Sequence, residues 1–167
     1  MGNKPEIINP PNRLRSKVKA GGPRAIDADA LKRAEAAIAD MADQYLDWVV
    51  QDLEKIGAAY EELKRSDQSD IRPLLKSIYQ VSHDIKGQGG SFGFDMMTLI
   101  GHKLCRQIEH ADTNNPKLVE SIGVYIDSLN LVISQRMTGD GGKTGEKMLE
   151  GLDQIFSKTT IRNSAAD

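Results

Sequence analysis

The residues best suited to chemistry lie in one short stretch, residues 81–93, which reads VSHDIKGQGGSFG. A helix through this stretch would bury a stripe of three isoleucines, Ile71, Ile78 and Ile85, because residues seven apart return to the same face. At about 100° per residue, His83 then lies roughly 160° from the stripe and faces water. An imidazole with an ordinary pKa of about 6.5 is largely neutral at pH 7. His83 is therefore predicted to be an exposed nucleophile that needs no general base.

The residues expected around His83 leave part of the helix surface bare. Lys86 flanks the histidine about 60° away, and Gly87 and Gly90 follow one and two turns later on its line. Glycine inside a helix costs about 1 kcal/mol relative to alanine, so a glycine run beside an exposed histidine needs a functional reason. The bare surface would let another protein's backbone approach the ring. The Lys86 ammonium would stabilise a phosphoryl group bound to that ring.

At these residues the sequence resembles the histidine-containing phosphotransfer (HPt) domain family. The family's pattern is His-x-x-Lys-Gly, a run of glycines or small residues, a further Gly, and a helix that ends in Cys-x-x-(Leu or Ile)-Glu. The chain has HDIKG at 83–87, Gly93, and CRQIE at 105–109, so the detailed match spans residues 83–109. Asp84 departs from the pattern, because the family commonly has Thr or another small residue there. This carboxylate would weaken the docking of an acidic partner.

The resemblance implies a phosphocarrier in a multistep His–Asp relay. A receiver domain's phospho-aspartate would give its phosphoryl group to His83, which would pass it to another receiver. Lys86 would support the phosphoryl charge, and Gly87 would keep the approach open. No intrinsic cofactor is implied, since the receiver supplies Mg²⁺, and the chain would be a transfer intermediate and not an enzyme, because it has no kinase domain. The implied partners are response regulator receiver domains and a hybrid histidine kinase, and the implied partner-binding residues are Lys76, Tyr79, Gln80, Gln88 and Gly90.

A second interpretation of the same residues is a helical docking or scaffold protein that uses the exposed patch without chemistry. The two interpretations differ in whether a phosphoryl group ever resides on the chain. Intact His83 and Lys86 favour the carrier, because a docking protein has no chemical reason to keep both.

The remaining candidate groups are predicted to be structural. His102 and His110 lie eight residues apart, about 12 Å along a helix, which is too far for one zinc ion to bind both directly, so no metal site is expected. Cys105 is expected to be a small buried residue. Gly101 would let a neighbouring helix approach closely. The triplet GKT at 142–144 lacks the earlier glycine and the preceding strand of a nucleotide-binding loop.

Apolar residues recur at three- and four-residue steps through most of the chain, which predicts helices. Polar turns that contain Gly, Pro or capping residues separate them, and short turns between amphipathic helices place neighbours antiparallel. The predicted fold is therefore all-α, an antiparallel up-and-down four-helix bundle with an extra N-terminal helical segment and a short C-terminal helix. The expected helices cover residues 29–65, with a break around 43–47, then 71–85, 97–108, 118–136 and 148–156.

The predicted organisation has three parts. Residues 1–26 form a flexible basic arm, with six Lys or Arg against one Glu and a net charge of +5. Residues 27–137 form the HPt-like bundle, and residues 138–167 hold a Gly-rich turn, a short helix and a tail. Segments 27–45 and 148–156 carry more apolar surface than a minimal bundle needs. They are expected to pack on one another or to form a homodimer contact.

Composition sets the class of protein. The 167 residues are 28% charged and 39% hydrophobic, as in a globular domain, and no apolar stretch approaches the roughly 20 residues of a membrane span. A single cysteine cannot form an internal disulfide and no secretory signal is evident, so a cytoplasmic protein is expected. Residues 27–138 carry 18 carboxylates against 12 Lys or Arg, and this acidic balance argues against nucleic-acid binding.

Overall fold

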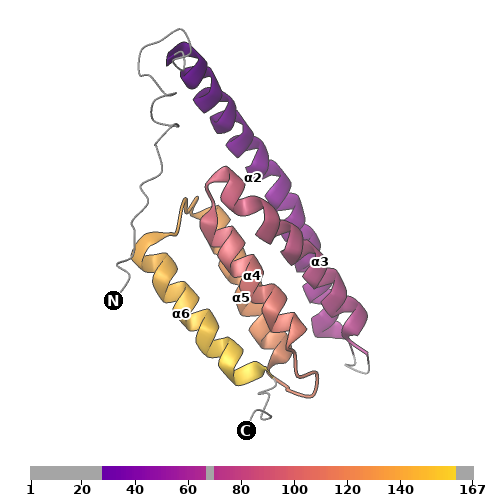
Figure 1. Cartoon of the computed structure of the whole chain (residues 1–167). Helices are drawn as coiled ribbons and strands as arrows, with labels where there is room; N and C mark the ends of the chain where they lie inside the picture. The colour runs from indigo at the N-terminus through magenta and orange to yellow at the C-terminus, as the bar shows by residue number, and fades with distance from the viewer. Residues whose placement is uncertain (1–27, 67–69, 161–167) are drawn as a thin grey trace, which may run out of the picture. The chain divides into compact units, whose positions relative to one another are not determined.

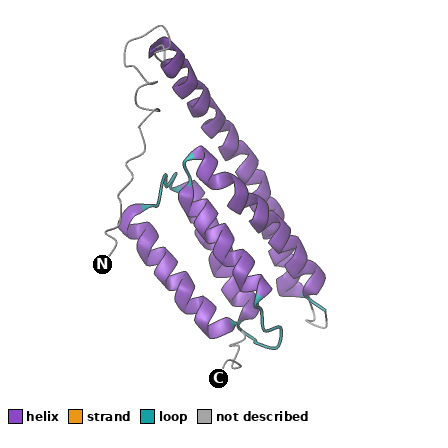
Figure 2. Cartoon of the chain, viewed as in Figure 1, coloured by secondary structure: helices purple, strands orange, loops and turns teal. Residues whose placement is uncertain are grey.

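The computed structural model describes residues 28–66 and 70–160, and most of these residues are helical (Figures 1 and 2). No strand occurs within these ranges, where a single isolated bridge joins Ala111 and Thr160, so the predicted all-α class is confirmed. None of the described helices combines the length and hydrophobicity needed to cross a membrane. The predicted arm at 1–26 lies outside the described residues. The elements are α2 (Ala28–Arg65), α3 (Arg72–Gln88), the 3-10 helix η1 (Gly89–Phe92), α4 (Asp95–Glu109), α5 (Leu118–Ser134) and α6 (Gly142–Thr159).

Helix α2 is one continuous helix of 38 residues, so the predicted break around residues 43–47 is wrong. Its buried positions Tyr45, Val49 and Leu53 keep the four-residue spacing of a single helix face. Neither Gly nor Pro lies within the expected break, and these are the residues that most often interrupt a helix.

The chain divides into two units. The first, residues 1–38, is described only from residue 28 onward, where it is the helical beginning of α2. The second, residues 39–167, contains the remainder of α2 and all the other helices. It holds both the hydrophobic core and the residues predicted to do chemistry.

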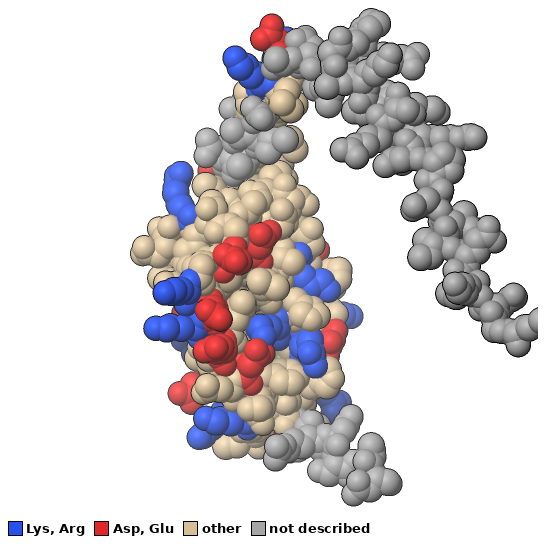
Figure 3. Space-filling model, turned by 60° about the vertical axis from the view of Figure 1, so that its left-hand side comes forward, with Lys and Arg blue, Asp and Glu red and all other residues tan. Residues whose placement is uncertain are grey.

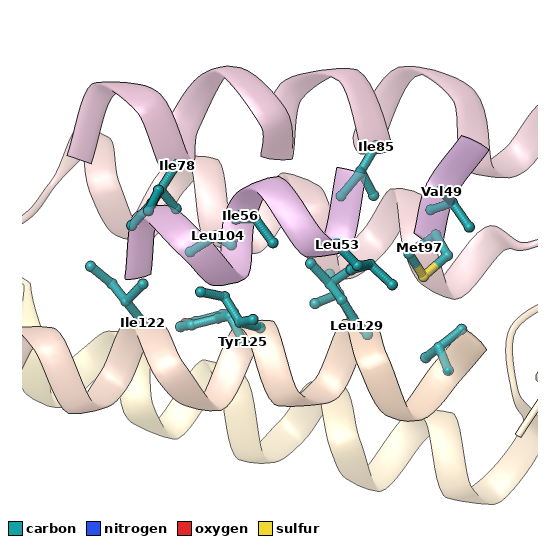
Figure 4. Packing of buried hydrophobic residues seen from close by; sticks show 14 of the residues in the cluster. Val49, Leu53, Ile56, Ile78, Ile85, Met97, Leu104, Ile122, Tyr125 and Leu129 are labelled. Carbon is teal, nitrogen blue, oxygen red and sulfur yellow. The ribbon is translucent and has the colours of Figure 1, made fainter. Parts of the chain in front are cut away.

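The core of the second unit is built from apolar side chains of α2, α3, α4 and α5 that point toward one another (Figure 4). Helix α3 packs along α4, and α4 packs along α5. The isoleucine stripe predicted for α3 is buried, and each such side chain contributes roughly 1.5–3 kcal/mol when it leaves water. The core residues labelled in the close view are Val49, Leu53, Ile56, Ile78, Ile85, Met97, Leu104, Ile122, Tyr125 and Leu129.

Two glycines set how closely α3 and the turn after it approach α4. A Cβ atom on Gly101 would lie 3.0 Å from both the Ser82 carbonyl oxygen and the Lys86 amide nitrogen. Gly89 is similarly tight, since its Cβ would lie 2.8 Å from the Cβ of Met97. The close approach predicted for Gly101 is confirmed, and it fixes the helix that carries the histidine to its neighbour through the backbone.

The turn after α3 is tied to the loop that follows α5. Gly93 ends η1 with a left-handed backbone (φ +79°), and its carbonyl accepts a hydrogen bond from the Gly139 N–H at 2.7 Å. The Gly139 carbonyl in turn accepts from the Met96 N–H at 3.1 Å. Two hydrogen bonds therefore hold the start of α4 to the loop before α6.

Helix α6 packs on α4 and α5 and is longer than predicted, since it begins at Gly142 and not near residue 148. Its first residues, 142–147, contain no large apolar side chain, so the apolar period that identifies a helix is missing there. Asp140 Oδ1 accepts a hydrogen bond from the Gly142 N–H at 2.9 Å, which satisfies one of the free donors at the helix start. The residues predicted as a short helix are the later part of a longer one.

A buried polar cluster fastens α6 to α4 and α5. The Gln107 side chain is fully buried, and its amide nitrogen donates to Ser121 Oγ at 3.3 Å and to Thr159 Oγ1 at 2.9 Å. The Tyr125 hydroxyl lies 3.4 Å from Gln107 Oε1 and donates to the Leu152 carbonyl at 3.0 Å. Burial raises the pKa of Tyr125. We call Gln107, Ser121, Tyr125 and Thr159 the Gln107 cluster.

Candidate functional site

His83 lies on the exposed face of α3, while its neighbours Ser82 and Ile85 are buried, as the helical period predicted. The Tyr79 ring, one turn earlier, stacks on the imidazole with ring centroids 6.2 Å apart and 28° between the planes. The Tyr79 hydroxyl donates to Glu109 Oε1 on α4 at 2.8 Å. This hydrogen bond raises the pKa of Tyr79 and holds its ring in place. The imidazole is therefore positioned by its neighbour and accessible from solvent.

Lys86 is half-buried on the side of α3 that faces α4, where its backbone lies against Gly101. Cys105 of α4 is buried nearby, as predicted, with Sγ 4.0 Å from the Tyr79 carbonyl oxygen. Burial raises the pKa of Cys105 to about 11, although the Lys86 ammonium opposes part of this effect. Cys105 is consequently a neutral thiol at pH 7 and a poor nucleophile.

The glycines that follow the histidine differ in their surroundings. Gly87 is exposed, and a Cβ atom there would meet nothing within 4 Å, so this position is open as predicted. Gly89 is buried against α4, so packing explains this glycine. Gly90 is exposed but lies in η1, where its N–H donates to Thr98 Oγ1 at 2.8 Å. The prediction that Gly90 continues the line of His83 by two α-helical turns is wrong, because the α-helix ends before Gly89.

A groove of about 560 Å³, which we call the His83 groove, lies between α2 and α3. Helix α2 contributes Asp52 and Lys55, whose side chains form an ion pair at 2.8 Å. These two residues could not be predicted from the sequence, because periodicity shows which face of α2 is buried and not which residues of α3 lie beside it. The α3 residues that line the groove are Tyr79, Gln80, Val81, His83 and Asp84.

The predicted partner-binding residues fall into separate places. Tyr79 and Gln80 line the His83 groove. Lys76 lines a neighbouring groove of about 370 Å³, between α3 and the end of α4, to which Tyr79 also contributes. Gln88 is exposed at the last position of α3. The structure thus brings Tyr79 and Gln80 together with the histidine, and it places Lys76 and Gln88 outside that groove.

The two other histidines lie on α4 and directly after it. His102 and His110 are both exposed. His110 Nδ1 lies 3.0 Å from the Arg106 carbonyl oxygen, and its ring meets the edge of Phe156 with centroids 5.9 Å apart. Within the described part of the chain, no group of three or more His, Cys, Asp or Glu side chains is arranged to hold a metal ion.

Charged side chains of both signs are intermingled on the face of the molecule shown in Figure 3. No large patch of one sign forms on that face. Nucleic acid binds where positive charge is concentrated, and the face in view lacks such a concentration.

Comparisons of the chain with models of known protein families, with curated proteins and with solved structures found no match. The function of the chain is therefore inferred from the geometry around His83 and from the motif at residues 83–109.

Proposed function

We propose that the chain is a phosphocarrier in a multistep His–Asp relay, with His83 as the phosphoacceptor. The observation that carries this proposal is an exposed imidazole with a lysine and an open glycine on the next turn. The imidazole supplies the nucleophile, and the Lys86 ammonium offsets the charge of the phosphoryl group. Gly87 leaves room for the backbone of a second protein.

In the proposed transfer, the lone pair of an imidazole nitrogen of His83 attacks the phosphorus of a receiver's phospho-aspartate. A nitrogen–phosphorus bond forms while the bond from phosphorus to the aspartate oxygen breaks, and the carboxylate leaves with that electron pair. The proton on the other ring nitrogen stays in place. The reverse sequence moves the phosphoryl group to another receiver. Mg²⁺ bound to the receiver would stabilise the transferring group, so this chain supplies a positioned nucleophile.

The proposal extends to the fold and the partners. Helices α2 to α5 would form the antiparallel four-helix bundle of an HPt domain, with α6 as an added helix. Response regulator receiver domains and a hybrid histidine kinase would be the partners, in the cytoplasm. The tight contact of α3 with α4 at Gly101 supports it, because transfer between proteins requires a nucleophile held in a fixed orientation on an accessible surface.

A homodimer contact, expected from the surplus of apolar surface, stays a prediction. Met41, within the predicted segment 27–45, is 48% exposed, and a second copy of the chain would cover it. Sedimentation of the whole chain should then show a dimer that Met41→Glu dissociates. A monomer at every concentration would contradict the contact.

The direct test of the carrier is transfer from receiver domains charged with acetyl phosphate, read by the intact mass of the chain. The wild type is expected to gain one phosphoryl group, and His83→Gln none. A double variant with His102→Gln and His110→Gln controls for the other exposed histidines. It should gain the group as the wild type does.

Two outcomes would overturn the proposal. A mass gain in His83→Gln would move the chemistry to another residue. No gain in the wild type, with receivers that load a known HPt protein, would support the docking or scaffold alternative.

A further inference from the structure

The His83 groove brings three charged side chains together beside the imidazole. Asp84 follows His83 on α3, and Asp52 and Lys55 come from α2. Two carboxylates and one ammonium thus line the space next to the proposed phosphoacceptor. A phosphoryl group would add almost two further negative charges. Once His83 is phosphorylated, negative charge therefore strongly exceeds positive charge in this groove.

The two sides of α3 differ in the charge that they offer to such a group. Lys86 lies on the side that faces α4, near Cys105. Asp84 lies about 100° around the helix from His83, on the side that faces α2, where it lines the groove. Lys86 can therefore support one side of the phosphoryl group. On the side that faces α2, the nearest charged residue of α3 is the Asp84 carboxylate, although a phosphoryl group there would need a cation.

Lys55 is the cation that α2 places in this groove. Its ammonium bonds Asp52 Oδ1 at 2.8 Å. This hydrogen bond is the main cause that raises the pKa of Lys55, and the charge of Asp84 adds to it, so the ammonium interacts with both carboxylates. The Lys55 side chain is 64% exposed, and exposed ion pairs hold their partners weakly. A lysine also has a flexible four-carbon stem and three donors, so its ammonium can leave Asp52 for a stronger anion.

We propose that Lys55 is a second phosphoryl-supporting residue, which exchanges Asp52 for the phosphoryl group when His83 is phosphorylated. Lys55 and Lys86 then flank the phosphohistidine from the α2 side and the α4 side of α3. The contact with the phosphoryl oxygens is charge-assisted on both partners and is therefore among the stronger hydrogen bonds of a protein. This inference rests on the proposed function, since it needs a phosphoryl group on His83.

The probe for a test is phosphoramidate, which phosphorylates an imidazole nitrogen directly. The nitrogen–phosphorus bond to the ring forms as the bond to the ammonia leaving group breaks, so no receiver is required. The whole chain would carry His102→Gln and His110→Gln, which leaves His83 as its single histidine. The second pKa of the phosphoryl group is then followed by ³¹P NMR.

Lys55→Gln is expected to raise the second pKa of the phosphoryl group, because a nearby ammonium favours the dianion. Asp84→Asn is expected to lower it. With a charged receiver, Lys55→Gln should also reduce the ratio of phosphorylated chain to phosphorylated receiver about three- to tenfold. Lys55→Arg should restore most of the ratio, and high salt should shrink the difference between Lys55→Gln and wild type.

Lys64→Gln is the matched control. Like Lys55, Lys64 lies on α2 and forms an ion pair with the carboxylate three residues before it, here Glu61 at 2.6 Å. Its side chain is 43% exposed, but it does not line the His83 groove. This variant is expected to leave both the pKa and the ratio unchanged. If Lys55→Gln gave the same second pKa of the phosphoryl group and the same phosphorylation ratio as Lys64→Gln, the role of Lys55 would be overturned. The proposed function would be left intact. Failure of phosphoramidate and receivers alike to modify His83 would overturn the proposed function, and the role of Lys55 with it.

Discussion

The Gln107 cluster, between α4, α5 and α6, and the surface at His83, on α3, both contain polar side chains but are arranged in opposite ways. Gln107 is fully buried, and its amide reaches Ser121 and Thr159 on two other helices. His83 is exposed beside an open groove, with a tyrosine ring as its neighbour. The first cluster is closed by partners from within the chain, whereas the imidazole of the second stays exposed to solvent.

This difference follows from the cost of desolvation. A buried polar group without a hydrogen-bond partner costs about 1–3 kcal/mol, so the Gln107 amide can be buried only because hydroxyl groups of neighbouring helices bond it. A nucleophile that serves a second protein must stay in contact with solvent until that protein docks. The helix that carries such a side chain then has to be held by its backbone. In this chain the backbone of α3 is held by its close contact with Gly101 of α4.

The largest contrast should come from replacing the central residue of each cluster. His83→Gln should abolish phosphoryl transfer and leave the free energy of unfolding nearly unchanged, because the side chain is exposed. Gln107→Ala should lower the free energy of unfolding by about 2–4 kcal/mol, because it removes the hydrogen bonds of the buried amide to Ser121 and Thr159 and opens a cavity. Urea unfolding and the mass assay, applied to both variants, would measure the contrast. A Gln107→Ala chain as stable as wild type would show that the cluster does not hold α6.

A second pair of variants sharpens the role of the backbone under His83. Gly101→Ala should cost about 1–3 kcal/mol, because its Cβ would lie 3.0 Å from backbone atoms of α3 that cannot rotate away. Gly57→Ala is the control, since a Cβ there meets nothing within 4 Å. It should stabilise α2 by about 0.5–1 kcal/mol. If Gly101→Ala and Gly57→Ala changed the free energy of unfolding in urea equally, the steric explanation would be wrong.

The last variant, Gly87→Ala, has a small expected effect on stability. It tests whether the open surface beside His83 is needed for a receiver to approach. Gly87→Ala should stabilise the chain by about 0.5–1 kcal/mol, because alanine is the better helix former and the position is open. The added methyl group would stand where a receiver's backbone is proposed to approach, so transfer from receivers should slow several-fold. Modification by phosphoramidate, which is small, should not change. Slower modification by both donors would point to a disturbed imidazole and not to a blocked approach.

Periodicity located the proposed phosphoacceptor because α3 has a single apolar stripe. Ile71, Ile78 and Ile85 define the buried face without ambiguity, and the exposure of His83 follows from its angle to them. Periodicity is a property of one helix, however, and does not show how two helices are turned relative to each other. For this reason Asp52 and Lys55, which line the groove from α2, could not be predicted from the sequence.

The other differences arise where a residue serves tertiary packing. The glycine run after His83 is predicted to leave the helix surface bare, but Gly89 fits tightly against Met97, and the α-helix gives way to a 3-10 turn there. Gln107 is polar and would be placed on the surface by composition, whereas its partners lie 14 and 52 residues away. Only the contact partners reveal the roles of such residues, and these partners are distant in sequence.

The two hydrogen bonds between Gly139 and the turn that starts α4 bear on whether the proposed carrier can be transplanted. A fragment that stops at residue 137 would lose both bonds and leave the Met96 N–H and the Gly93 carbonyl without these partners. It would also lose the α6 residues that cover Gln107. A graft onto another protein would therefore need to continue to Thr159. The surface at His83 and helix α6 should therefore be transferred together, as one segment of the chain.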